Sequence, residues 1–118
     1  METKRAAIIH GYEHALDMSE KMLGHASAME WQELIELEHV YLCEIDQLRD
    51  LDGQVALDDD RRVYKRKILE RMLSNGDQLR QLLQLKLAEL SQLIDKNRMQ
   101  QQVSRAYGEV SHLLRRSP

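Results

Sequence analysis

The stretch QLRQLLQLKLAELSQLI, residues 78–94, carries apolar side chains over an unusually wide part of a helical surface. With each residue turned by about 100°, its leucines and Ile94 cover an arc of about 200°, whereas a surface helix needs an apolar stripe of about 100°. Only Gln78, Lys86 and Glu89 interrupt this arc. One neighbouring helix cannot bury so wide an arc, so we expect the two flanks of this helix to be covered by different neighbours.

The same register continues towards the N-terminus and predicts one long helix from about Asp59 to Ile94. Three upstream apolar side chains fall on the same arc: Ile68, Leu69 and Met72. A break in the sequence SNGD, residues 74–77, would usually lose that register, so the helix is expected to be weakened at Gly76 but not ended there. At 1.5 Å per residue it would span about 54 Å.

Two shorter helices are expected before it. The first would run from about Thr3 to Leu23 and end at Gly24, since glycine takes the left-handed conformation without strain. The second would run from about Ser27 to Leu51, because SAME at 27–30 has the pattern of a capping box. So short a connection folds the two helices back antiparallel, and each would span about 30 to 35 Å. The long helix therefore overhangs them and can accept both on one flank.

A short fourth helix, from about Arg98 to Leu114, is expected to cover the other flank. Its apolar side chains recur at helical spacing: Met99, Val103, Ala106, Tyr107, Val110, Leu113 and Leu114. Because this helix is short, contains Gly108 and is C-terminal, it would be marginal on its own. The predicted fold is all-α: an antiparallel bundle of three helices, the third long (about 59–94), with the fourth packed as a movable cover.

Composition sets the domain organisation and the broad class of protein. The 118 residues suffice for one domain, 1–118, with a three-helix core over 1–94 and a regulatory C-terminal helix over 98–116. The single cysteine excludes an internal disulfide, and a net charge of −3 gives no global field for nucleic acid. No apolar run approaches a membrane span, and the first residues lack a signal peptide. We therefore expect a cytoplasmic protein.

The sequence carries no pattern of catalytic groups. It shows no phosphate-binding glycine loop, no nucleophile motif and no paired carboxylates, so neither an enzyme nor a cofactor is expected. His10, His14 and Asp17 have the spacing of metal ligands on one helix face. No cysteine or further histidine lies near them in the sequence, and exposed histidines are common on a polar face, so we expect no metal site.

The sequence RRVYKRK, residues 61–67, is the one cluster of positive charge. It contains Arg61, Arg62, Lys65, Arg66 and Lys67. One interpretation is a solvated helix face neutralised by the aspartates at 58–60. The other is a docking patch for an acidic partner protein. Nucleic acid is disfavoured, because few aromatic residues lie among the charges and the chain is acidic overall.

Three stretches also carry a resemblance: EWQELIELEHVYLCEI (30–45), LLQLKLAELSQLI (82–94) and AYG (106–108). In their order and spacing they closely resemble the FliT family of enterobacterial flagellar export chaperones, and the length and helix layout match over nearly the whole chain. The resemblance implies a cytoplasmic chaperone that keeps the C-terminal segment of the filament-cap protein FliD soluble and delivers it to the export apparatus. It also implies contacts with the ATPase-complex proteins FliI and FliJ, with the export gate, and with FlhC of the FlhDC activator. Binding of FlhC would inhibit this activator and so repress class-two flagellar operons.

In that family the C-terminal helix gates the partner-binding surface, and the marginal fourth helix of this sequence fits that arrangement. We expect a partner helix to bind in a groove of the long helix. The predicted groove residues are Leu79, Leu82, Leu83, Leu85, Lys86, Leu90 and Leu93, and the predicted regulatory-helix residues are Met99, Val103, Ala106, Tyr107, Val110 and Leu114.

Two other functions stay open. A structural homodimer would use the same leucines as a permanent interface. A DNA-binding regulator would show a steep salt dependence of binding. The sequence also leaves open whether the fourth helix packs on its own bundle or reaches into a neighbouring molecule.

Overall fold

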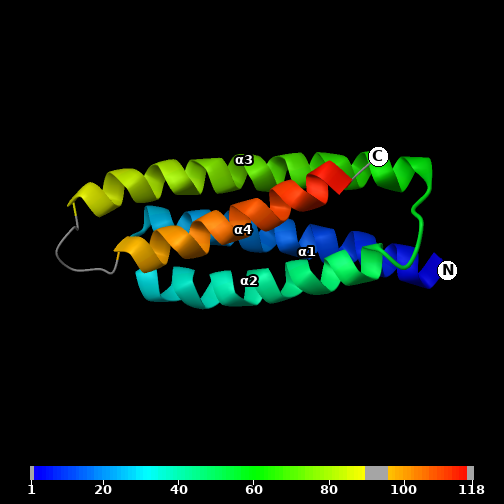
Figure 1. The fold of residues 1–118 in the computed structure, drawn as a ribbon, viewed down its shortest axis with the longest axis horizontal. Coiled ribbons are helices and arrows are strands. Elements are labelled where there is room, and N and C mark those ends of the chain that lie inside the picture. Colours follow the sequence, from blue (N-terminus) through cyan, green and yellow to red (C-terminus); the bar gives the residue numbers. More distant parts are fainter. Residues whose placement is uncertain (1, 90–95, 117–118) are drawn as a thin grey trace.

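The computed structural model describes residues 2–89 and 96–116, with side chains described over 2–88 and 102–115. The described chain forms four α-helices and no strand: α1 (Glu2–Ser27), α2 (Trp31–Asp52), α3 (Asp59–Glu89) and α4 (Lys96–Arg116). The all-helical prediction is confirmed. As Figure 1 shows, the helices lie side by side, and each runs opposite in direction to the one before it.

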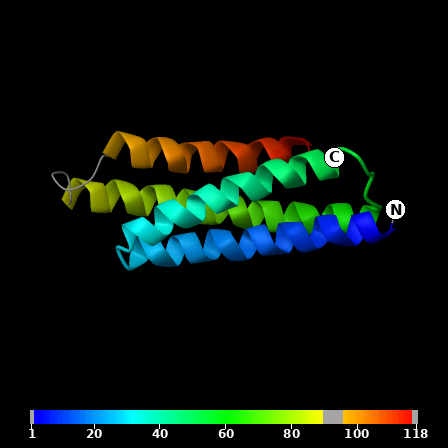
Figure 2. The ribbon, with the colours of Figure 1, turned by 90° about the horizontal axis from the view of Figure 1, so that it is seen from below.

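The helices make a four-membered bundle in which the neighbours differ from those predicted. α1 packs against α2 and α3, and α4 packs against α3 and α2, whereas the backbones of α2 and α3 lie at opposite corners (Figures 1 and 2). The prediction that the first two helices share one flank of the third is therefore wrong for α2. α4 completes the bundle as its fourth member instead of covering one flank of a three-helix core.

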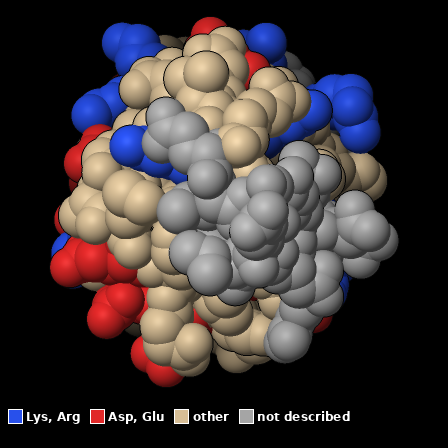
Figure 3. All heavy atoms as spheres, turned by 90° about the vertical axis from the view of Figure 1, so that its left-hand side faces the viewer, with Lys and Arg blue, Asp and Glu red and all other residues tan. Residues whose placement is uncertain are grey.

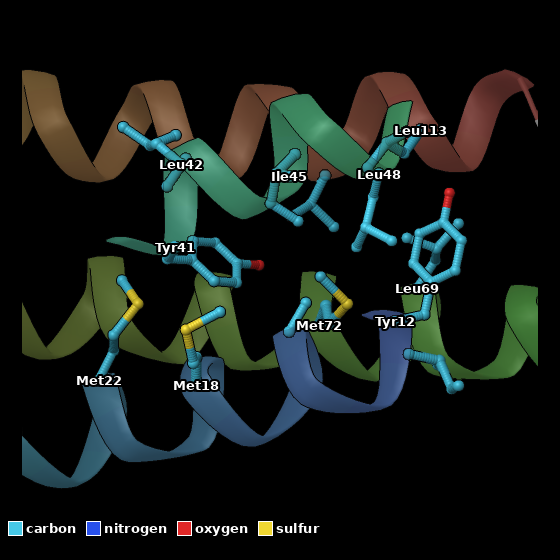
Figure 4. Close-up of a cluster of buried hydrophobic side chains, with 14 of the residues drawn as sticks. Tyr12, Met18, Met22, Tyr41, Leu42, Ile45, Leu48, Leu69, Met72 and Leu113 are labelled. Carbon is cyan, nitrogen blue, oxygen red and sulfur yellow. The ribbon is translucent and has the colours of Figure 1, made fainter. Parts of the chain in front are cut away.

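The apolar stripes of all four helices meet in one core (Figure 4). Two loop residues, Val55 and Leu57, are also buried and belong to it. The described members are Ile8, Tyr12, Ala15, Met18, Met22 and Ala26 from α1, Leu34, Tyr41, Leu42, Ile45 and Leu48 from α2, Ile68, Leu69, Met72, Leu79, Leu83 and Leu87 from α3, and Val103, Ala106, Val110 and Leu113 from α4.

The joint between α1 and α2 differs from the prediction. α1 continues past Gly24 to Ser27, whose hydroxyl donates to the carbonyl of Leu23 at 2.9 Å inside the helix. The chain then turns at Met29, which has a φ of 59°, and Glu30 precedes α2 without a side-chain cap. Since Ser27 is used inside α1, it cannot cap α2, and the predicted capping box is wrong.

α3 runs unbroken through Gly76 as far as Glu89, as predicted, while the predicted end at Ile94 lies outside the described residues. The structure also gives Gly76 a reason. A Cβ at this position would lie 3.0 Å from ring atom Cδ2 of Tyr107 in α4. Glycine therefore lets the aromatic ring of α4 approach the backbone of α3.

Candidate protein-binding site

α4 packs against α2 and α3, and its apolar stripe faces the surface that these two helices form. We call this surface of α2 and α3 the seat of α4. Val103, Ala106 and Val110 are buried, and Tyr107 is half-buried. Arg105, Gly108 and His112 are exposed on the opposite side, as the helical spacing predicts. Of the predicted regulatory-helix residues, Leu114 is half-buried, and the side chain of Met99 lies outside the described ones.

The predicted groove residues of α3 fall into four groups. Leu79 and Leu83 are buried, and together with α4 residues they line small pockets between the two helices. Leu82 and Lys86 are half-buried, whereas Leu85 is 68% exposed and faces solvent. Leu90 and Leu93 lie outside the described residues. Sequence reasoning did not select Leu87, which is buried and belongs to the core.

One aromatic ring fixes α4 to α3. Tyr107 packs over Gly76, and the guanidinium of Arg80 lies 5.2 Å from the centroid of the Tyr107 ring. At that distance an arginine is attracted to the ring face by about 0.5–1 kcal/mol at an exposed site. The packing of Tyr107 over Gly76 is therefore specific in shape, whereas the contact of the ring with Arg80 adds little energy.

The contact between α4 and α2 combines a polar pair with a buried acid. Arg49 Nη1 donates to Glu109 Oε2 at 2.6 Å, and Arg49 Nη2 lies 3.2 Å from Asp46 Oδ1. Glu38 of α2 is buried, and burial raises the pKa of its carboxyl. Burial also raises the pKa of the Tyr41 hydroxyl well above its usual range.

Sequence reasoning missed Glu38 as a site residue, although a signal was present. Glu38 lies four residues after Leu34 and four before Leu42, so it stands in the middle of the apolar stripe of α2. A charged residue at such a position is either buried or interrupts the stripe. The position alone could therefore have selected it.

The predicted basic patch is only partly exposed. Lys65 is 5% exposed, and its Nζ donates to Asp52 Oδ2 at 2.9 Å. The hydroxyl of Tyr12 donates to the same oxygen at 2.7 Å, so this group ties α1, α2 and α3 together. Lys65 is therefore a structural residue, and including it in a docking patch was wrong.

The other four members of the patch lie at the surface. Arg61 is half-buried and pairs with Glu2 and Asp58, and Arg62 is half-buried and pairs with Asp59. Arg66 and Lys67 are exposed, and neither forms an ion pair with a side chain of residues 2–88 or 102–115. What remains of the patch is therefore two exposed cations on α3.

The end of the bundle shown in Figure 3 carries charges of both signs. Lys and Arg gather towards the top of this view, the side of α3 in Figure 1, and Asp and Glu towards the lower left. Among the described atoms of this view, uncharged side chains lie between the two groups. The described part of this end is therefore a mixed surface.

His10 and His14, whose spacing on one helix face is that of metal ligands, contact different carboxylates. Nδ1 of His10 lies 3.4 Å from Glu13, whereas Nδ1 of His14 lies 2.7 Å from Glu44 of α2. Over the described residues, no group of three or more His, Cys, Asp or Glu side chains is placed to hold a metal ion. No helix in the described part of the chain is long and apolar enough to cross a membrane.

Together these features define a small helical-bundle protein whose terminal amphipathic helix fills a seat between two others. Comparison with known proteins points in one direction. A profile of the family described as "Flagellar protein FliT" matches residues 9–109. Flagellar protein FliT of Shigella sonnei is 31% identical over 98 residues, which cover 83% of this chain and 81% of that protein.

Two further relatives agree. Flagellar protein FliT of Pectobacterium atrosepticum is 29% identical over 102 residues, covering 86% of this chain and 81% of its own length. The FliT of Escherichia coli O1:K1 / APEC is 30% identical over 98 residues, covering 83% of this chain and 81% of its own. The chain belongs to the FliT family, and membership of this family implies a flagellar export chaperone.

Proposed function

We propose that this protein is a cytoplasmic type III export chaperone that binds the C-terminal segment of the filament-cap protein FliD. Binding would keep that segment soluble, prevent its premature assembly and deliver FliD to the export apparatus. The observation that carries the proposal is the seat of α4: an amphipathic helix already lies between α2 and α3 with Val103, Ala106 and Val110 buried. A partner helix with the same pattern of apolar residues would fit the same seat.

In this mechanism α4 is a movable, regulatory helix that competes with the client. A client needing the seat binds only the fraction of molecules in which α4 has left, so the apparent affinity is lowered by that fraction. The client would then contact the α3 side of the seat, with Leu79, Leu82 and Leu83 as apolar anchors and Lys86 at its edge. Leu85, being exposed, is available to a partner whether or not α4 moves.

The remaining partners follow from the family and from the surfaces that stay accessible. We propose that FlhC binds this chaperone, which removes the FlhDC activator from class-two flagellar operons without direct contact to DNA. We propose further that the export proteins FliI and FliJ and the export gate receive the loaded chaperone. Arg66 and Lys67 on α3 are candidates for docking an acidic surface of one of these partners.

Removal of α4 tests the proposal. A chain ending at Asp95 should bind the FliD C-terminal segment more tightly than the full chain, measured by calorimetric titration. A partner that binds the outer face of α3 should show no gain, which makes it the internal control. Equal loss of binding for all partners would refute gating by α4. A concentration-independent dimer in sedimentation, with the seat buried between two chains, would favour the structural homodimer instead.

A further inference from the structure

A buried carboxylate stands in the part of the seat contributed by α2. Glu38 is 2% exposed, and within the described residues neither of its carboxylate oxygens has a hydrogen-bond partner. Buried charged groups in folded proteins are nearly always paired, because an unpaired one keeps the full cost of leaving water. Leu34 and Leu42, one turn away on either side, belong to the core, so the neighbours of Glu38 along this face of α2 are apolar. Two nearby basic side chains, His39 and Arg105, lower the pKa of the carboxyl, but burial is the larger effect and raises it. An unpaired buried carboxylate is therefore expected to have a function.

Glu38 lies on the face of α2 that meets α4. Arg49 marks the face of α2 that meets α4, since it pairs with Glu109 of that helix. Glu38 precedes Arg49 by eleven residues, which is roughly three helical turns, so the two side chains share this face. Arg105, four residues before Glu109 in α4, also acts on Glu38, because its positive charge lowers the pKa of the carboxyl.

The described side chains of α4 nevertheless leave the carboxylate unsatisfied. The exposed guanidinium of Arg105 makes no recorded hydrogen bond to Glu38, and the residues that α4 buries in the seat are apolar: Val103, Ala106, Val110 and Leu113. Among the described side chains, closed α4 therefore supplies no donor to this acid. A helix that supplied a donor at this point would gain a charged hydrogen bond that α4 does not make.

We propose that Glu38 is a specificity residue of the α4 seat, which accepts a hydrogen bond from a lysine or arginine of an incoming amphipathic helix. The inference rests on the proposed function and adds the chemistry of the client. The client helix carries apolar residues at i, i+3 or i+4, and i+7, with one basic residue among them. The carboxylate of Glu38 weakens the docking of α4 and strengthens the binding of the client helix. It therefore favours replacement of α4 by the client.

A double-mutant cycle on the full-length chain tests this role. The variants are Glu38→Gln and a control, Glu36→Gln, which changes an exposed acid of the same helix. The probe is the FliD C-terminal segment, either unchanged or with each Lys and Arg replaced in turn by Gln. We expect Glu38→Gln to weaken binding about tenfold. One basic-residue replacement should weaken binding to the unchanged chain by a similar factor and have little further effect on Glu38→Gln.

The cycle separates two effects of the Glu38→Gln change. Firmer closure of α4 lowers the affinity for every segment variant equally, whereas loss of the pair is confined to one basic residue. Slower amide exchange in α4 of Glu38→Gln would report the firmer closure independently. If the segment binds but no basic residue couples to Glu38, the inference is overturned and the proposed function stands. If the segment does not bind the unchanged chain at all, the proposed function fails and the inference with it.

Discussion

Shortening Leu113 to alanine should loosen α4 while the rest of the bundle stays folded. Leu113 is buried near the C-terminal end of α4, where it lines a surface pocket together with the loop residues Val55 and Leu57. Removing a buried leucine costs about 2–5 kcal/mol, depending on how far the site collapses around the gap. A surface pocket adjoins Leu113, so the site can collapse, and we take the lower end of that range, about 2 kcal/mol.

A loss of about 2 kcal/mol in α4 docking raises the population of the open state about 30-fold. The apparent affinity for a client that needs the open state rises by up to the same factor, until the open state dominates. Amide exchange measured by mass spectrometry gives the opening of α4, and calorimetric titration with the FliD C-terminal segment gives the affinity.

The matched control is Ile8→Ala, which removes a buried side chain from α1. Because the backbones of α1 and α4 lie at opposite corners, this variant should lower global stability without a selective gain in α4 exchange. The reasoning is refuted if Leu113→Ala leaves exchange in α4 unchanged relative to the core. It is also refuted if both variants weaken segment binding equally.

Three further substitutions test other contacts. Burial holds the pKa of the Glu38 carboxyl above its ordinary value of 4.5. The protonated carboxyl therefore contributes fully to the free energy of unfolding below pH 4.5, and this contribution is lost as the pH rises through the raised pKa. Urea titrations across that window should show a flatter pH dependence for Glu38→Gln, and an unchanged slope would contradict the burial. Lys65→Gln should cost about 3 kcal/mol of unfolding free energy in urea, against at most about 0.5 for Lys67→Gln. Equal losses of unfolding free energy in the two variants would indicate that Lys65 is a surface residue like Lys67. Glu109→Gln should speed amide exchange in α4 about fivefold, since a half-exposed pair is worth up to about 1 kcal/mol. The control Glu20→Gln breaks an exposed pair between α1 and α3 and should leave amide exchange in α4 unchanged.

Helical periodicity alone predicted the elements, because it depends on local spacing. The continuity of α3 through Gly76 followed from the register of its apolar residues, and the apolar stripe of α4 was identified as well. The wheel could not resolve the edges of the wide arc on α3. Leu87 and Leu85 lie at opposite edges of that arc, yet Leu87 is buried and Leu85 is exposed, because only the placement of α1 and α4 decides which edge is covered.

Features that depend on tertiary contacts were beyond the sequence. Ser27 satisfies the pattern of a capping box, but α1 extends far enough to use its hydroxyl internally. Lys65 belongs to a run of basic residues, yet its position on the inner face of α3 places it beside Asp52. The packing of α2 against α4 was missed, because a short connection fixes only which helix follows back on which.

Amide exchange of α4 in the unchanged chain, with and without the FliD C-terminal segment, tests the central claim most directly. We predict that α4 exchanges faster than the core before the segment is added, and faster still once the segment occupies its seat. Protection around Leu79 and Leu83 of α3 should be retained or increased. Protection of α4 as strong as that of the core, unchanged when the segment binds, would show that α4 does not gate the site.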